Sequence, residues 1–167
     1  LIVFLGSLLL TISAKIKIPF YPVPMTMQTF VVVLMGVTFG WKISVATISL
    51  YLFEGIVGLP VFAGTPEKGV GLVYFMGPTM GYLIGFLFAT FFAGYLNLKT
   101  NMFFVFLKLI LSVSIIYIFG ILWLWNLIGW DKPILELGLM PFLLAELFKI
   151  SLLTILTRKL IKFRKFI

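Results

Sequence analysis

Residues 102–126 read MFFVFLKLILSVSIIYIFGILWLWN, and Lys108 is the one charged side chain among them. A helix needs about 20 predominantly apolar residues to cross the roughly 30 Å hydrocarbon core of a bilayer. This stretch meets that length, and the rest of the chain is similar: of 167 residues, 62% are hydrophobic and 11% are charged, and the mean hydropathy is +1.22. Soluble domains average about 45–50% apolar and about 25% charged residues. The sequence therefore predicts an integral membrane protein.

The apolar segments divide at prolines, glycines and charge clusters into six predicted membrane helices, which form one transmembrane domain over residues 1–167. Because the first residue is Leu1, we expect the chain to begin inside its first hydrophobic segment, with a short N-terminal piece missing. The predicted fold class is an all-α integral membrane protein. Its helices are expected at about residues 1–18, 26–40, 42–58, 78–97, 102–126 and 140–161.

Six helices place both termini on one side of the membrane, and the distribution of charge indicates which side that is. Basic residues gather in the cytoplasmic segments of membrane proteins, and Lys42 and Lys99 fall in loops on the side of the termini. In so apolar a chain, the net charge of +8 favours anionic lipid over nucleic acid as the partner of the basic residues. We therefore predict a cytoplasmic C-terminal tail. Its basic residues are Arg158, Lys159, Lys162, Arg164 and Lys165.

Several classes of enzyme are excluded by composition. The chain has no Cys and no His, so it lacks structural disulfides, thiolate metal sites, the usual base of a serine triad and the HExxH zinc pair. The stretch GTPEKGVG at residues 64–71 lacks the GxxxxGK[ST] spacing that cradles phosphates. We expect a protein that is not an enzyme and that uses no metal or cofactor. Any uphill transport would draw on an ion gradient or on an energy-supplying partner.

A stripe of small residues follows one face of the fourth predicted helix. From Gly77 to Ala93, every fourth residue is Gly or Ala, which lets a neighbouring helix backbone approach closely. We interpret the stripe as packing within the chain, with a docking face for another subunit as the alternative. Shorter pairs of the same kind are Gly36 with Gly40 and Ser7 with Thr11.

The last predicted helix contains two charges that need a separate explanation. The segment MPFLLAELFK, residues 140–149, carries Glu146 and Lys149 at a depth that approaches the middle of the membrane. Each charge costs about 2.5–3.5 kcal/mol there, so both side chains should face the bundle interior or water. An i, i+3 spacing puts them on one helix face, where they could simply neutralise each other. The alternatives are a site for a solute with hydrogen-bond donors at one end and an anion at the other, or a path for a proton or cation.

Glu54 raises a similar question near the end of the third predicted helix. Its carboxylate either reaches water at the outer surface or faces a cavity. Aromatic residues surround the nearby Gly-rich turns, and they are either an interfacial belt or the walls of a ligand pocket. These aromatic residues are Tyr51, Phe62, Tyr74, Phe75 and Tyr82.

Five blocks of the sequence resemble the BioY family, which comprises the biotin-binding S components of energy-coupling factor (ECF) transporters. The blocks occur in the family's order and at its spacing, and they cover nearly the whole chain. The pair GLPVFAG and GPTxGYLIGF is specific to the family. The blocks are PVPMTMQTF (22–30), YLFEGIVGLPVFAGT (51–65), GVGLVYFMGPTMGYLIGF (69–86), GILWLWNLIG (120–129) and PFLLAELFK (141–149).

The resemblance implies a six-helix S-component fold in the bacterial cytoplasmic (inner) membrane, with both termini cytoplasmic. It implies high-affinity biotin binding near the outer face, under the loop that follows the first helix. The implied partners are biotin, a transmembrane coupling protein and two cytoplasmic ABC-type ATPases that use ATP, although some BioY-like proteins are thought to work alone. In the first helix, where the family favours alanines four apart, the implied docking residues are Ser7, Thr11 and Ala14.

The last block departs from the family pattern at one position. The family usually carries Gly-Asp where this chain has Ala145-Glu146, whereas Lys149 matches. Glu keeps the charge and reaches one methylene further. The resemblance implies that Glu146 or Glu54 accepts hydrogen bonds from the ureido ring of biotin, and that Lys149 holds its carboxylate. The remaining predicted site residues are Gln28, Thr79 and Tyr82 as polar contacts, Phe62 against the rings, and Tyr51 and Gly71.

Two other functions stay open on the sequence. One is an S component for a different vitamin, because S components share a fold across ligands. The other is a structural or assembly membrane protein without a ligand, which would not need two charges in its core. Thermal stability measured with biotin and with other vitamins would discriminate among these functions, because a ligand stabilises the protein that binds it.

Overall fold

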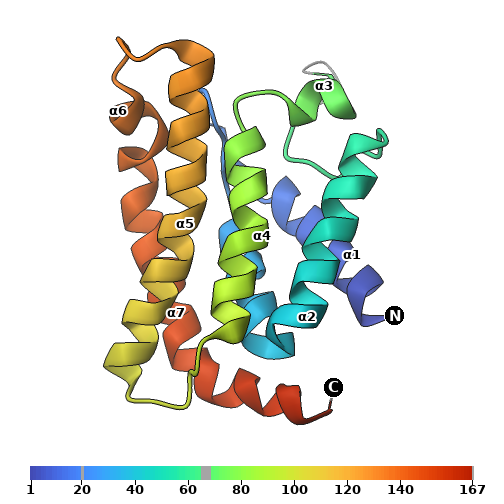
Figure 1. The fold of residues 1–167 in the computed structure, drawn as a ribbon, viewed down its shortest axis with the longest axis vertical. Helices are drawn as coiled ribbons and strands as arrows, with labels where there is room; N and C mark the ends of the chain where they lie inside the picture. Colours follow the sequence, from blue (N-terminus) through green and yellow to red (C-terminus); the bar gives the residue numbers. More distant parts are fainter. Residues whose placement is uncertain (20, 65–68, 167) are drawn as a thin grey trace.

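The polypeptide forms an elongated bundle whose main helices run along its long axis (Figure 1). The computed structural model describes residues 1–19, 21–64 and 69–166, so residues 65–68 of the GTPEKGVG stretch lie outside the description. The elements are α1 (Ile2–Lys15), β1 (Lys17–Ile18), β2 (Met25–Thr26), α2 (Gln28–Ile56), α3 (Leu72–Phe75), α4 (Met80–Tyr95), α5 (Met102–Ile128), α6 (Ile134–Gly138), the 3₁₀ helix η2 (Met140–Phe142), α7 (Leu143–Leu160) and the 3₁₀ helix η3 (Ile161–Phe166).

Helix α2 is folded in two at Gly40, which adopts φ 74° and ψ 172°. Glycine enters this region readily because it has no Cβ. The two halves lie against each other, and Gln28 near one end is hydrogen-bonded to Tyr51 near the other. With α2 counted as two helices, the described residues contain the six predicted membrane helices, and the predicted fold class is confirmed. By length and composition, the stretches Gln28–Ile56, Met102–Ile128 and Ile134–Arg164 can cross a membrane, and α1 and α4 are shorter apolar helices.

A short β-ribbon follows α1, although the predicted first helix extended to residue 18. β1 and β2 pair antiparallel, with Lys17 opposite Thr26 and Ile18 opposite Met25. Ile18 precedes Pro19, and the proline ring disfavours the α conformation of the residue before it. The helix therefore ends at Lys15, and the ribbon extends over the same end of the bundle as α3 and α6 (Figure 1).

The small-residue stripe of α4 packs within the chain, as predicted. A Cβ on Gly85 would lie 2.8 Å from the Cα of Ile116 in α5, and one on Gly81 would collide with the carbonyl of Phe119. On the other side of α4, a Cβ on Gly36 would lie 2.6 Å from the carbonyl oxygen of Thr90. Helix α4 is thus held between α2 and α5 at distances that only small residues permit.

Two of the three implied docking residues of α1, Ser7 and Ala14, face inward, which corrects their assignment to a docking surface. Ser7 is 1% exposed and Ala14 is 0% exposed, and Thr11 donates to the backbone carbonyl of Ser7. These residues pack against α2, because a face without bulky side chains allows the helices to approach closely. The exposed face of α1 is apolar and includes Phe4, Leu5, Leu8 and Ile12.

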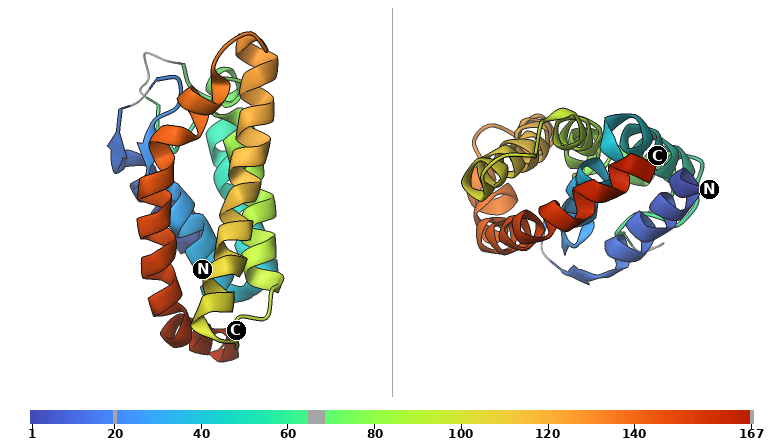
Figure 2. Two further views of the ribbon diagram at one scale, coloured as in Figure 1. Left: turned by 90° about the vertical axis from the view of Figure 1, so that its left-hand side faces the viewer. Right: turned by 90° about the horizontal axis from the view of Figure 1, so that it is seen from below.

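The C-terminal segment η3 crosses beneath the bundle, as the view from below shows (Figure 2). Arg164 turns inward there: its Nε donates to the carbonyl of Val37 at 2.8 Å, and its Nη2 donates to Gly36 at 2.9 Å and to Ala93 at 3.2 Å. These carbonyls belong to the ends of helical segments, which lack partners of their own. Arg164 therefore does not join the predicted lipid-facing tail, whereas Arg158, Lys159 and Lys162 are exposed.

Candidate ligand-binding site

A buried cavity, which we call the inner cavity, lies where the β-ribbon and the loop after α2 meet α4, α5 and α7. Its volume is about 40 Å³. Most of its walls are aliphatic and aromatic. Its non-aromatic polar groups come from β2, α2, α7 and the residue before α4. Its lining residues are Val23, Pro24, Thr26, Gln28, Thr29, Phe62, Ala63, Tyr74, Thr79, Tyr82, Leu83, Phe86, Ile116, Tyr117, Phe142 and Glu146.

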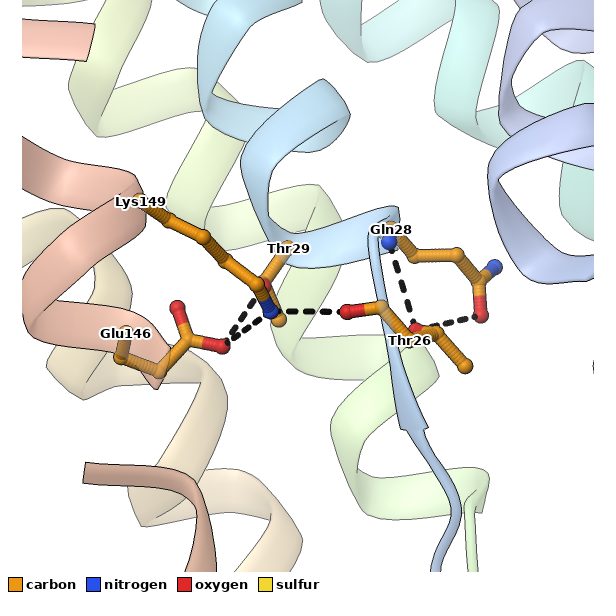
Figure 3. Close-up of polar contacts among 5 residues, drawn as sticks. All are labelled: Thr26, Gln28, Thr29, Glu146 and Lys149. Atoms are coloured by element: carbon orange, nitrogen blue, oxygen red, sulfur yellow. Dashed lines mark hydrogen bonds and ion pairs between the residues drawn. The ribbon is translucent and has the colours of Figure 1, made fainter. Parts of the chain in front are cut away.

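Glu146 and Lys149 form a buried ion pair at the edge of this cavity, with the side chains drawn in Figure 3. Lys149 Nζ lies 2.8 Å from Glu146 Oε1, and it also donates to the Thr29 hydroxyl at 2.9 Å and to the Thr26 carbonyl at 2.7 Å. The Thr29 hydroxyl in turn donates to Glu146 Oε1 at 2.7 Å. An ammonium has three N–H donors, so these three acceptors occupy Lys149 completely.

The two members of the pair differ in their access to the inner cavity. The pair shows the mutual neutralisation that the i, i+3 spacing allows, and Glu146 and Lys149 are 5% and 6% exposed. Glu146 lines the cavity, whereas Lys149 stands behind it. The second carboxylate oxygen, Oε2, accepts no hydrogen bond of normal geometry from the described residues, although the Tyr117 phenol is near enough to interact with the carboxylate. Helix α7 therefore presents a hydrogen-bond acceptor to the cavity, whereas its ammonium group is already occupied.

Phe62 forms an aromatic wall of the inner cavity. Its ring stacks on Tyr74 with centroids 5.4 Å apart, and it meets Tyr51 edge-on at the same distance. Gly55 makes room for this ring, because a Cβ there would collide with it. The Tyr51 hydroxyl donates to the Val61 carbonyl at 3.1 Å and accepts from the Gln28 amide at 2.7 Å. Tyr51 thus holds the wall and Gln28 from behind, without lining the cavity.

The predicted site residues divide between the cavity and its surroundings. Gln28, Phe62, Thr79, Tyr82 and Glu146 line the inner cavity. Tyr82 also donates its hydroxyl to the Gly138 carbonyl at 2.8 Å, which connects α4 to α6.

Four predicted residues lie elsewhere: Lys149 and Tyr51, as described above, together with Glu54 and Gly71. The Glu54 carboxylate accepts a hydrogen bond from Ser7 and so faces α1. Gly71 has φ 67° and lines a separate small cavity beside Lys15.

Sequence reasoning did not single out three residues that the structure brings to the cavity. Thr29 bridges both charges of the ion pair, and Tyr117 and Phe142 contribute aromatic walls. Thr29 lies one position after Gln28, in the PVPMTMQTF block, and this adjacency is the only signal in the sequence that points to it. Tyr117 lies in the middle of an apolar helix, where no neighbouring residue distinguishes it.

A second cavity, which we call the outer cavity, adjoins the inner one. It has a volume of about 300 Å³ and lies between the β-ribbon and α3. The two cavities share Pro24, Ala63, Tyr74 and Thr79, which form the partition between them. Burial raises the pKa of the Tyr74 phenol, so this partition carries a neutral hydroxyl at physiological pH. Lys17 is the one charged residue among the described residues that line the outer cavity.

Two apolar grooves flank α7. The groove between α5 and α7 has a volume of about 390 Å³, and Glu146 and Tyr117 form part of its lining. The groove between α7 and the β-ribbon has a volume of about 270 Å³, and Lys149 forms part of its lining. Helix α7, which carries the ion pair, is therefore less enclosed by protein than α4.

The bundle and its enclosed cavity define a multi-pass membrane protein with a site for a small molecule at one end. The model of the BioY family matches residues 1–166, and the chain belongs to this family. It is 34% identical to the probable biotin transporter BioY of Pyrococcus horikoshii over 91% of this chain and 89% of that protein. It is 34% identical to the biotin transporter BioY of Thermotoga maritima over 92% of this chain and 90% of that protein.

A solved structure gives the same result for the fold. The crystal structure of the S-component for biotin from an ECF-type ABC transporter superposes with a TM-score of 0.79 at 26% sequence identity. The alignment covers 95% of this chain and 87% of that chain. The S-component fold therefore extends over nearly all of the bundle.

Proposed function

We propose that this chain binds biotin with high affinity and serves in its uptake across the cytoplasmic membrane, as the substrate-binding S component of an ECF-type transporter. One observation carries the proposal: in a chain of the BioY family, the inner cavity presents a carboxylate oxygen between aromatic walls. An enclosed apolar site with few convergent polar groups is the usual form of a small-molecule site.

The ureido ring of biotin supplies hydrogen-bond donors for the carboxylate of the inner cavity. It carries two N–H groups and one carbonyl, beside an apolar sulfur-containing ring. Glu146 Oε2 is available to accept from an N–H, and hydrogen bonds to a carboxylate are about twice as strong as neutral ones. The Gln28 amide lines the cavity and can serve the ureido carbonyl, while Phe62 packs on the rings. Lys149 neutralises Glu146, so the acceptor costs less to bury.

The carboxylate of biotin belongs at the other end of the site. In the inner cavity it would approach Glu146 and find Lys149 already occupied by three acceptors. In the outer cavity it meets Lys17, whose ammonium donates to only one acceptor among the described residues, the Ala63 carbonyl. This assignment replaces Lys149 with Lys17 as the partner of the carboxylate. A ligand of this length spans both cavities and displaces their partition.

The energy for uptake comes from partner subunits in this proposal. We infer a transmembrane coupling protein and two ABC-type ATPases on the cytoplasmic side, where both termini and the exposed basic residues of α7 and η3 lie. Since Ser7 and Ala14 are buried, the coupling protein would meet the apolar face of α1 described above. Thr11 lies at the edge of that face.

Calorimetric titration of the purified protein with biotin tests the proposed function. We expect saturable binding in the wild type and in the Glu136→Gln variant, because Glu136 lies on the exposed side of α6. Glu146→Gln retains a side chain of the same size but loses the charged acceptor, so its affinity should fall about tenfold or more. If biotin does not bind but another vitamin shifts the melting temperature, the chain is an S component for that vitamin.

A further inference from the structure

We infer that Lys15, which does not line the inner cavity, is a positioning residue for ligand binding because it holds the aromatic wall from α1. This inference rests on the proposed function for the identity of the ligand. Its structural basis is a set of hydrogen bonds between the end of α1 and the loop after α2. We call the loop residues Pro60–Ala63 the wall segment.

The ammonium groups of two lysines bind the backbone of the wall segment. Lys15 Nζ donates to the Pro60 carbonyl and to the Phe62 carbonyl, each at 2.7 Å. Lys17 Nζ donates to the Ala63 carbonyl. Three consecutive residues of the loop, Val61, Phe62 and Ala63, are buried, although the loop belongs to no helix or strand. Buried backbone carbonyls need partners: the lysines supply them for Phe62 and Ala63, and the Tyr51 hydroxyl supplies one for Val61.

The wall segment places the side chain that the ligand would contact. Phe62 is 5% exposed and lines both the inner cavity and the small cavity beside Lys15. Its ring is fixed from the side by Tyr51 and from the face by Tyr74. Lys15 holds the Phe62 backbone carbonyl, and Tyr51 and Lys17 hold the carbonyls on either side. Because Lys15 binds the carbonyls on both sides of Val61, removing its ammonium breaks two of the hydrogen bonds that hold the backbone that carries the ring. The effect on the ligand therefore passes through Phe62.

Lys15 links the wall segment specifically to α1. Ser7 of the same helix donates to Glu54 in α2, so α1 is joined to α2 at one level and to the wall segment at another. A shift of α1 along its axis would move the Lys15 ammonium, and the wall segment that is bonded to it would move in the same direction. The position of α1 and the shape of the inner cavity are thus coupled by one side chain.

A set of five variants tests this inference. Lys15→Met keeps the length of the stem and removes the donors, whereas Lys15→Arg keeps donors. Lys42→Met, at an exposed position two residues after the fold of α2 at Gly40, controls for loss of a positive charge. Phe62→Leu, alone and combined with Lys15→Met, shows whether Lys15 acts through the ring. Biotin affinity is measured by calorimetry, and amide hydrogen exchange of the wall segment is measured without ligand.

We expect Lys15→Met to raise the dissociation constant about tenfold, which corresponds to about one charge-assisted hydrogen bond. Lys15→Arg and Lys42→Met should bind like the wild type. In Phe62→Leu, the further change Lys15→Met should weaken binding by much less than tenfold, because residues that act through one another are not additive. Unliganded Lys15→Met should exchange the Val61 and Phe62 amides faster than the wild type.

Two results would overturn the inference. One is wild-type affinity in Lys15→Met, and the other is a full additive loss in the double variant, which would mean that Lys15 acts independently of Phe62. The exchange measurement separates this inference from the proposed function. If the wild type does not bind biotin, the proposed function fails, and unchanged exchange in Lys15→Met would show separately that the wall segment is held without Lys15.

Discussion

Removal of the Lys149 ammonium should strongly destabilise the protein. In Lys149→Met, the Glu146 carboxylate stays buried, 5% exposed, and loses its ion-pair partner at 2.8 Å. The Thr26 carbonyl and the Thr29 hydroxyl lose their donor as well. Breaking a buried ion pair from one side costs about 3–5 kcal/mol, because an uncompensated charge remains. For a chain of this size, that corresponds to a drop of roughly 6–20 °C in the melting temperature.

The assay is thermal unfolding of the unliganded protein in detergent, followed by tryptophan fluorescence. Lys159→Met is the matched control, because Lys159 lies on the same helix and is exposed, and it should melt like the wild type. In Glu146→Leu/Lys149→Met both charges are gone, so this double variant should be more stable than Lys149→Met alone. The reasoning is refuted if Lys149→Met melts at the wild-type temperature, or if the double variant is less stable than the single one.

Three further predictions concern packing and hydrogen bonding away from the ion pair. Gly36→Ala should cost about 1–3 kcal/mol of unfolding free energy, because its Cβ would lie 2.6 Å from the Thr90 carbonyl oxygen; an unchanged melting curve would contradict this. Arg164→Met should accelerate proteolysis of the C-terminal segment by removing its three hydrogen bonds to α2 and α4, while Arg164→Lys should recover part of the protection. Tyr51→Phe leaves the buried Gln28 amide without its partner and should cost about 1–3 kcal/mol; chemical denaturation at equal protein concentration would measure the loss.

The six helices could be predicted from the sequence because each is an apolar run that is bounded at its ends by Gly, Pro or charged residues. The turn at Gly40 was predictable for the same reason, since Gly40 stands between two short apolar runs and is followed by Trp41 and Lys42. The packing of α4 followed from its spacing, because glycine every four residues has few uses in a membrane helix other than close approach. These features depend on local sequence alone.

The arrangement of the site could not be predicted in the same way. In helices that are apolar all round, hydropathy does not indicate which face is inside, so nothing local shows that Glu54 turns toward α1 and away from the cavity. The contact between Thr29 and Glu146 joins residues 117 positions apart. The inward turn of Arg164 depends on the position of three carbonyls on other helices. The family resemblance pointed to several residues that line the inner cavity, but it did not separate Glu146, which lines the cavity, from Lys149, which stands behind it.

The grooves on both sides of α7 expose the surroundings of the Glu146–Lys149 ion pair to whatever medium surrounds the bundle. One groove reaches Glu146 and the other reaches Lys149, so in a bilayer we expect hydrocarbon chains to complete the low-dielectric shell on these sides of the ion pair. Charges attract each other more strongly where the dielectric constant is low. A detergent that packs poorly into these grooves admits water and weakens the pair. Affinities measured in micelles and in lipid nanodiscs should therefore differ, and the length of the acyl chains is an experimental variable in its own right.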